Sequence, residues 1–475
     1  MKSNYKTTLI LFLIIFSSVS LFFTSCKEED PIIIDETATE FNVNGNEITI
    51  VDKGKGIGTK TLNADTVWVL EGFVFVNDGQ VLTIEAGTVI KGKPGTGENA
   101  SAMIVARGGK IMAEGTAAKP IIFTTYADDL NGSVPFDSKG LWGGLIILGK
   151  ATTNNATSEK AIEGIPTSET RGLFGGTDDN DNSGVLKYIS IRHGGSDIGE
   201  GNEINGLTLG AVGKATVIEF IEVVSNQDDG IEFFGGCPQV KNAIVAYCGD
   251  DCFDYDEGFH GKGQFWVAIQ DASGDRCGEH DGGPSDNQLG TPYSIPQIYN
   301  ATYIGGKGAS SKVITFRENA GGTYANSIFV SQTSGIDIEY RQDESANLTG
   351  CSYKMWQENN LNVDNNIFYD IAGIIEVAEG YASTLFKVSA PKDANGVALY
   401  SVPADLKTAW ANAFEGNTNS LVNPEISATN PVPASAQTTD LATLPSGDTF
   451  FTTTTYKGAF DASNWATGWS LTFSE

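Results

Sequence analysis

The sequence is poor in histidine and in basic residues, and both shortages limit what the protein can bind. Only 3 His occur among 475 residues, which argues against a transition-metal site built mainly from histidine. Lys and Arg total 30 against 59 Asp and Glu, so the formal net charge is -29. Such a surface repels nucleic acid and anionic lipid headgroups. We therefore expect no nucleic-acid partner and consider cations, neutral glycans or another protein as ligands.

Long apolar runs are also scarce, and the one clear example lies at the N-terminus. Residues 9–23 are mostly apolar, follow two lysines and precede Thr24, Ser25 and Cys26. This pattern is typical of a secretory signal peptide, and its end resembles a bacterial lipoprotein signal in which Cys26 carries the lipid after cleavage. No later run approaches the about 20 apolar residues that span a bilayer, so we expect attachment by lipid alone.

The residues after Cys26 bear on which side of the membrane the protein faces. Residues 27–30 read Lys-Glu-Glu-Asp and resemble the tag that sends Bacteroidota lipoproteins to the cell surface. A solvated linker would have the same composition. We expect a lipid-anchored protein of the outer membrane that faces the cell exterior.

Helix-period patterns are nearly absent, whereas 56 Gly, 25 Phe and tracts of Thr, Ile and Val favour strands. The best helical candidate is Ala404–Phe414. The motif "DDGIEFFGG" (Asp228–Gly236) aligns with "DDCFDYDEG" (Asp250–Gly258) after 22 residues, and with "DRCGEHDGG" (Asp275–Gly283) after a further 25. The chain therefore contains an internal repeat.

A repeat of this length cannot bury its own apolar face, so it must stack on copies of itself. Stacking at about 4.8 Å per layer predicts an all-β right-handed parallel β-helix. A β-propeller would need a period near 40 residues, and a β-sandwich would not need so regular a register.

The solenoid prediction divides the chain into four parts. We expect the signal peptide over residues 1–25, a lipidated N-terminus and linker over 26–45, the β-helix over 46–400, and a C-terminal capping segment over 401–475. A cap is expected because the open end of a solenoid would otherwise template aggregation.

Several segments resemble one family as a set. They are "NEINGLTLGAVGKATVIEFIEV" (202–223), the two acid-pair motifs, and "YKGAFDASNWATGWS" (456–470). Together they are similar to a largely uncharacterised family of Bacteroidota cell-surface lipoproteins with a pectate-lyase-like parallel β-helix. The resemblance covers nearly all of the mature chain. It implies the fold and the location and carries little about activity.

The repeat predicts three stacked columns of mostly acidic residues. Their members are Asp228, Asp250 and Asp275 in the first; Asn205, Asp229, Asp251 and Arg276 in the second; and Thr208, Glu232, Asp254 and Glu279 in the third. Stacked carboxylates repel unless a cation, a proton or a basic residue such as Arg276 intervenes. Calcium suits such clusters, and we name Asp228, Asp250, Asp254, Asp275 and Glu279 as candidate ligands. The alternative is that these acids cap turns, and repeat because the turn repeats.

A second calcium candidate lies upstream. Asp179, Asp181 and Ser183 have the alternate spacing that opens a calcium loop, with Gly184 at the turn. The twelfth position is Ser190 instead of glutamate, so the loop is not an EF-hand. An ordinary polar loop is the alternative.

Five cysteines remain after Cys26, and an exported chain can keep disulfides. The repeat places Cys252 next to Cys277, within the separation that a disulfide allows. Cys237 with Cys248 is the second candidate pair, which leaves Cys351 free. Buried, unbonded thiols are the alternative.

An enzymatic interpretation starts from the acid pairs, which are similar to the aspartate motif of polygalacturonases. Asp228, Asp229, Asp250 and Asp251 would then supply acid and base, with His260 in support. The downstream Arg-x-Lys element of those enzymes is absent. A polysaccharide lyase would instead use calcium, with Arg276 or Arg317 as the base. Repetition of the acids argues against both, because an active site normally occurs once.

Aromatic residues near the acidic columns suggest a binding role, since exposed rings stack on sugars or anchor protein interfaces. The candidates are Trp142, Phe174, Phe233, Phe234, Tyr255, Phe259, Phe265 and Trp266. The alternative is that those on inward-pointing strand positions belong to the core, and at most one of Phe265 and Trp266 should face in. We therefore predict a non-catalytic module that binds a glycan or a TonB-dependent outer-membrane transporter, with calcium in a structural role. A polysaccharide-degrading enzyme is the alternative.

Overall fold

The computed structural model describes residues 38–199, 202–284, 287–416 and 418–474. The chain divides into two units, Met1–Glu36 and Thr37–Glu475. The predicted signal peptide, the predicted lipidation site Cys26 and most of the predicted linker lie outside the described residues. None of the described helices is long and apolar enough to cross a membrane.

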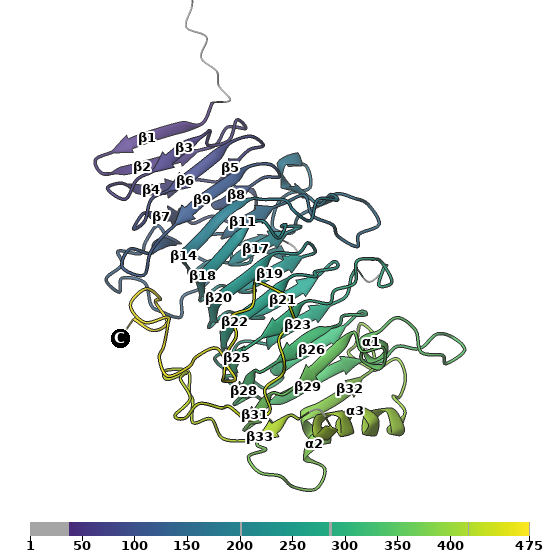
Figure 1. The fold of residues 1–475 in the computed structure, drawn as a ribbon. Coiled ribbons are helices and arrows are strands. Elements are labelled where there is room, and N and C mark those ends of the chain that lie inside the picture. The colour runs from purple at the N-terminus through teal and green to yellow at the C-terminus, as the bar shows by residue number, and fades with distance from the viewer. Residues whose placement is uncertain (1–37, 200–201, 285–286, 417, 475) are drawn as a thin grey trace, which may run out of the picture. The chain divides into compact units, whose positions relative to one another are not determined.

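Two large sheets form the second unit, and their strands stack in sequence order (Figure 1). The first, called sheet B, has ten strands that all pair in parallel. They are β5 (Phe73–Val76), β8 (Ala102–Val105), β11 (Leu145–Leu148), β17 (Leu207–Gly210), β19 (Ile231–Phe234), β21 (Phe253–Asp256), β23 (Arg276–Asp281), β26 (Lys312–Arg317), β29 (Ser334–Glu339) and β32 (Phe386–Ser389).

The second, called sheet A, has 19 strands. They are β1 (Glu40–Asn44), β2 (Glu47–Val51), β3 (Lys60–Leu62), β4 (Val67–Leu70), β6 (Val81–Ile84), β7 (Val89–Gly92), β9 (Lys110–Glu114), β10 (Ile121–Thr125), β14 (Gly184–Arg192), β18 (Val217–Val224), β20 (Gln239–Ala246), β22 (Lys262–Ile269), β24 (Gln297–Tyr299), β25 (Thr302–Ile304), β27 (Gly322–Ala325), β28 (Ile328–Val330), β30 (Leu361–Asp364), β31 (Ile367–Tyr369) and β33 (Ser420–Leu421). Only β1 and β2 pair antiparallel among them, at the N-terminal edge.

Sheet A turns a corner within its longest strands. One strand, β14, pairs with both β9 and β10, and β22 pairs with both β24 and β25. At the bend each long strand has one residue with positive φ, and these residues are Tyr188, Phe220, Asn242 and Phe265. A left-handed residue breaks the strand direction, so sheet A supplies two faces of each coil and sheet B the third. The predicted fold class, a parallel β-helix, is confirmed.

The inside of the coils is filled by apolar side chains that stack from layer to layer. Phe253 lies 4.5 Å from Trp266 and 5.8 Å from Tyr303 between ring centroids, with the rings nearly parallel. All three are buried. Aromatic pairs of this kind add about 0.5–1.5 kcal/mol each beyond area burial, which favours a single register of stacking.

Smaller elements interrupt the coils. They are the hairpin β12 (Lys160–Ala161) with β13 (Leu173–Phe174), the hairpin β15 (Asp197–Gly199) with β16 (Asn202–Glu203), the 3₁₀ turns η1 (Gly97–Asn99) and η2 (Thr170–Gly172), and the helices α1 (Ser352–Gln357), α2 (Tyr381–Leu385) and α3 (Ala404–Gly416). The helix expected over Ala404–Phe414 is therefore present as α3. Its Trp410 and Phe414 lie one turn apart and pack on Phe386 of β32, so α3 covers the last strand of sheet B.

Residues 422–474, here called the return segment, run back along the outside of sheet A, in yellow in Figure 1. Phe460 and Trp469 pack against the outward side chains of β18, β20 and β22. The carboxylate of Glu222 accepts hydrogen bonds from the backbone N–H groups of Leu471 and Thr472, both at 2.8 Å. The segment expected as a cap therefore has two parts. Of these two parts, α3 covers the C-terminal end of the coils. The return segment instead packs on the side, because the outer faces of β18, β20 and β22 are apolar.

Candidate functional site

The acidic columns follow the predicted register. Glu232 pairs with Thr208 on one side and with Asp254 on the other, and Asp254 pairs with Glu279. The same column continues through Thr315 to Asp337 and Lys387. This set of stacked acids and its flanking acids on sheet B is called the acidic ladder below.

The second aspartate of each pair has a structural contact that repeats. Asp229 accepts a hydrogen bond from the backbone N–H of Asp251 at 2.8 Å, and Asp251 accepts one from the N–H of Arg276 at 2.6 Å. Both carboxylates are buried, with exposed fractions of 7 % and 1 %. Each therefore ties its own turn to the turn of the next coil. The pairs repeat because this contact repeats.

The first aspartates lie nearer the solvent. Asp250 is exposed, whereas Asp228 and Asp275 are half-buried. Carboxylate oxygens of Asp228, Asp229 and Asp250 lie within 4.8 Å of one another, and so do those of Asp250, Asp251 and Asp275. A further group joins Asp229, Glu232 and Asp254. Four predicted calcium ligands, Asp228, Asp250, Asp254 and Asp275, thus fall in these clusters. Each cluster is tight enough for its own members to share one cation.

Basic residues compensate only one end of the ladder. Nη1 of Arg276 lies 3.2 Å from Asp251, 2.8 Å from Asp275 and 3.0 Å from Glu279. Arg317 binds Asp281 through two hydrogen bonds of 2.9 and 2.8 Å and also pairs with Glu279. The predicted calcium ligand Glu279 is therefore already held by two arginines.

The other end, called the cation-free half, comprises Asp228, Asp229, Glu232, Asp250 and Asp254. Within the described part of the chain, none of these five forms an ion pair within 4 Å. Burial and then neighbouring carboxylates raise the pKa of Asp228 to about 7. The same causes, in the same order, raise the pKa values of Asp229, Glu232 and Asp254 well above the usual range. These carboxyls must bind protons or a cation to be stable together.

The predicted calcium loop has a different geometry from the one its spacing suggests. Asp179 Oδ1 accepts a hydrogen bond from the N–H of Thr152 at 3.0 Å, while Oδ2 lies 3.5 Å from Nε2 of His260. Asp181 instead accepts a hydrogen bond from the hydroxyl of Ser183 at 3.3 Å. Asp179 thus groups with Cys237 and His260, within 4.8 Å, and not with Asp181. The repeat stacks Gly236 on Gly258 and so predicts that Cys237 and His260 lie close together in neighbouring coils. It gives no sign that Asp179 joins them.

All five described cysteines are buried free thiols, so neither predicted disulfide is formed in this structure. Cys252 and Cys277 are neighbours in the stack, as the register requires. Cys277 lies 3.4 Å from the amide oxygen of Gln270. Cys248 belongs to the inner core, whereas Cys237 lies outside it against Asp179, which separates the second predicted pair. Burial raises the pKa of Cys248 to about 12.

The aromatic residues proposed from the sequence as sugar-stacking surfaces are buried, and this interpretation is wrong. Trp142, Phe233, Tyr255, Phe259 and Trp266 have no exposed surface, and Phe174, Phe234 and Phe265 reach at most 8 %. Most of them point inward and stack with one another, as Phe233 does on Phe259 at 4.4 Å. The sequence pattern alone did not reveal which face of each strand points into the coil.

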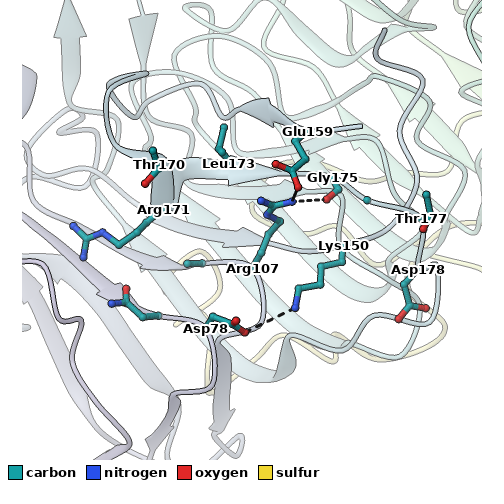
Figure 2. Close-up of a pocket in the computed structure, with 13 residues that line it drawn as sticks. Asp78, Arg107, Lys150, Glu159, Thr170, Arg171, Leu173, Gly175, Thr177 and Asp178 are labelled. Carbon is teal, nitrogen blue, oxygen red and sulfur yellow. Dashed lines mark hydrogen bonds and ion pairs between the residues drawn. The ribbon is translucent and has the colours of Figure 1, made fainter. Parts of the chain in front are cut away.

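Two cavities on the outside of the solenoid share Arg171 and are together called the Arg171 trough. The first, of about 750 Å³, is shown in Figure 2, where Arg107, Lys150 and Glu159 are among its lining residues. Arg107 donates to Glu159 at 2.7 Å, and Nζ of Lys150 lies 3.8 Å from Asp78. The second, of about 630 Å³, is lined by charged residues and by Phe73, which is half-buried.

Arg171 is held between the two cavities. It binds Asp52 at 2.8 Å and Glu169 at 2.6 Å, and its guanidinium lies 3.8 Å from the ring centroid of Phe75. A cation fixed by two carboxylates and an aromatic face keeps its position without a ligand. A third cavity, of about 580 Å³, lies at the other end of sheet B beside Arg276, Lys312, Arg317 and Arg341.

Comparison with known proteins identifies the family. Residues 54–380 match the family of pectate-lyase-like β-helix domains. The chain belongs to this family. No curated protein matches it. A solved structure, the Dettilon tailspike protein, aligns over 70 % of this chain at 11 % identity and a TM-score of 0.23. The chain covers 62 % of that tailspike's length.

The arginines of this pectate-lyase-like β-helix do not have the properties of a catalytic base. Burial is the largest single effect and lowers the pKa of Arg276 and of Arg317. Several neighbouring carboxylates together raise each pKa by more, so the net pKa of both arginines is raised. A guanidinium that several acids hold in its charged form cannot accept a proton. The ion pairs of Arg276 and Arg317 with carboxylates therefore weigh against either arginine as the base, and the lyase interpretation stays a prediction. In the acid pairs, the second aspartates bind the backbone of the next coil, and the first aspartates lie in the carboxylate clusters.

Proposed function

We propose that this pectate-lyase-like β-helix is a non-catalytic carbohydrate-binding module, lipid-anchored through Cys26 at the outer face of the outer membrane. Family membership supports a carbohydrate-related function. The observation that carries the binding proposal is the Arg171 trough, because its two cavities meet at Arg171 and their volumes, about 750 and 630 Å³, lie in the range of ligand-binding sites.

The chemistry of the trough suits a glycan. Arg107 and Lys150 offer N–H donors at its edge, and Glu159 and Asp78 offer acceptors. Half-buried Phe73 supplies an apolar surface in the second cavity. The two cavities together thus offer polar groups and an apolar ring, the two kinds of surface that a sugar-binding cleft combines.

The test is binding of the purified protein to a panel of neutral and uronic-acid polysaccharides, measured by calorimetry. We expect binding to weaken at least about tenfold in Lys150→Ala and in Phe73→Ala, and to be unchanged in Lys119→Ala, whose exposed side chain lies outside the trough. Equal binding by all four proteins would refute the trough as the site. If no polysaccharide binds and a TonB-dependent transporter co-purifies, the partner is a protein.

We also propose that calcium occupies the cation-free half, with Asp228, Asp229 and Asp250 as ligands. Their clustered oxygens support this, and among the described side chains no basic group lies within ion-pair distance of the three. Calorimetric titration of chelator-treated protein should show binding that Asp250→Asn abolishes. Exposed Glu344, outside the ladder, gives the matched control Glu344→Gln. Retained binding in Asp250→Asn would exclude this site.

One observation favours the enzymatic alternative. A pKa of about 7 at Asp228 leaves part of this carboxyl protonated at neutral pH beside ionisable Asp250, as a general acid requires. The same polysaccharides should therefore be assayed for new reducing ends and unsaturated products. Product that disappears in Asp228→Asn would replace the binding proposal with a polysaccharide-degrading activity.

The anchoring proposal has its own test. Metabolic labelling with a fatty acid should label the wild type and not Cys26→Ser, and protease added to intact cells should digest the labelled protein. Labelling that persists in the variant, or full protection from protease, would contradict lipid attachment at Cys26 or exposure at the surface.

A further inference from the structure

Three residues with different metal-binding groups meet outside the acidic ladder. Asp179 lies in the loop after β13, Cys237 between β19 and β20, and His260 between β21 and β22. One ligand atom from each lies within 4.8 Å of the other two. None of the three belongs to the carboxylate clusters of the ladder.

The spacing of the histidine and the aspartate fits two ligands of one ion. Nε2 of His260 lies 3.5 Å from Oδ2 of Asp179. A charge-assisted hydrogen bond would be shorter, at about 2.7–2.9 Å. Two ligand atoms at about 2.0–2.1 Å from a tetrahedral Zn²⁺ lie about 3.3–3.4 Å apart. The observed separation is therefore closer to that of co-ligands than to that of a direct ion pair.

The surrounding contacts orient the ligand atoms. Nδ1 of His260 lies 2.8 Å from the carbonyl oxygen of Gly258, so Nδ1 carries the proton and donates it there. This directs the other ring nitrogen, Nε2, toward Asp179, in the arrangement that commonly supports a metal-bound histidine. Asp179 uses Oδ1 for the N–H of Thr152, which leaves Oδ2 for another partner.

Backbone hydrogen bonds hold Cys237 and His260 in place. The N–H of Cys237 donates to the carbonyl of Val212, and the N–H of His260 donates to that of Gly236, both at 3.0 Å. Cys237 is buried, whereas Asp179 and His260 are half-buried. One side of the cluster is thus enclosed by protein, and the other is accessible to a fourth ligand such as water.

We propose that Asp179, Cys237 and His260 form a site for a divalent transition-metal ion of the Zn²⁺ type. A thiolate, an imidazole and a carboxylate are ligands that Zn²⁺ accepts together, whereas calcium takes only oxygen. Three protein ligands leave one coordination position open. On binding, the thiol of Cys237 loses its proton to solvent and the sulfur bonds the metal.

The experiment is titration of chelator-treated full-length protein with Zn²⁺ by calorimetry, and with Co²⁺ by absorption spectroscopy. Wild type should bind one Zn²⁺ at this site, and Co²⁺ should give a thiolate-to-metal charge-transfer band. His260→Gln and Asp179→Asn should each weaken Zn²⁺ binding at least about tenfold. Cys237→Ser should abolish the cobalt band. Cys248→Ser is the matched control, since this buried thiol lies in the core away from the cluster, and it should keep both signals.

Two further controls keep the result interpretable. Circular dichroism of each variant tests folding, and the half-buried His260 and Asp179 can be changed with less risk to the core than Cys237. Asp250→Asn should leave the cobalt band intact, because the ladder has no thiolate. The proposal is overturned if Co²⁺ gives no thiolate band, if Cys248→Ser removes it, or if folded His260→Gln binds Zn²⁺ as wild type does.

Discussion

The two ends of the acidic ladder share one sheet and one register, yet differ in how their charge is balanced. In the paired half, Arg276 and Arg317 contact Asp251, Asp275, Glu279 and Asp281. In the cation-free half, similarly stacked acids form no ion pair among the described residues. Burial, followed by neighbouring carboxylates, raises the pKa values there, and it also raises that of Asp251 in the paired half. The fold repeats the positions of the acids, while two arginines decide which clusters have direct ion pairs and which must be balanced by protons or an added cation.

The largest expected effect comes from breaking the paired half. Arg276→Met removes the partner of three carboxylates, of which Asp251 is 1 % exposed. An unpaired buried charge costs about 3–5 kcal/mol, so the urea midpoint at neutral pH should fall strongly. Lys93→Met, which removes an exposed ion pair with Glu71, is the control and should change it little. Equal midpoints for the two variants would show that the arginine is not needed.

The pH dependence should sharpen the comparison. The pKa of Asp228 rises from about 3.8 unfolded to about 7 folded, so the folded state binds more protons in this interval. The contribution of this carboxyl to the free energy of unfolding is therefore greatest below about pH 4, and it is lost as the pH rises from there through 7. In chelator, the wild-type urea midpoint should be lower at pH 8 than at pH 5, and Asp228→Asn should reduce this difference. A wild-type midpoint that rises over the same interval would contradict the assignment.

Calcium should reverse that trend if it binds the cation-free half. At pH 8 the carboxylates are available as ligands, so added calcium should raise the melting temperature more than at pH 5. Asp250→Asn should remove most of the increase. Asp281→Asn, in the paired half, should retain it, and loss of the effect in both variants would mean that the two halves do not differ in calcium binding.

The smallest effect is expected where a carboxylate keeps a second partner. Lys312 binds Asp337 at 2.7 Å, but Asp337 also accepts a hydrogen bond from Ser389 at 2.9 Å. Lys312→Ala should therefore cost only about 1 kcal/mol, measured by the urea midpoint. If Lys312→Ala lowers the urea midpoint as much as Arg276→Met does, the second partner of Asp337 does not compensate for the lost lysine.

Much of the ladder could be predicted from the repeat, because a shift of 22 to 25 residues defines one turn of the coil and so defines which residues stack. Asp229 over Asp251 and Glu232 over Asp254 follow from that period alone. The proposed role of the aromatics failed for a local reason. In a triangular coil with bends at residues such as Phe220, strict alternation does not tell which side chain points inward.

The sequence by itself determined the parallel β-helix, the register of the acids and the presence of a helix over residues 404–414, since each depends on periodicity or local spacing. Only the tertiary structure decided the contacts that cross between coils and loops. Asp179 meets Cys237 and His260 across 58 and 81 residues of chain, and Glu222 holds the return segment from 249 residues away. No local pattern encodes such meetings, because they depend on how far each loop departs from the coil before it returns.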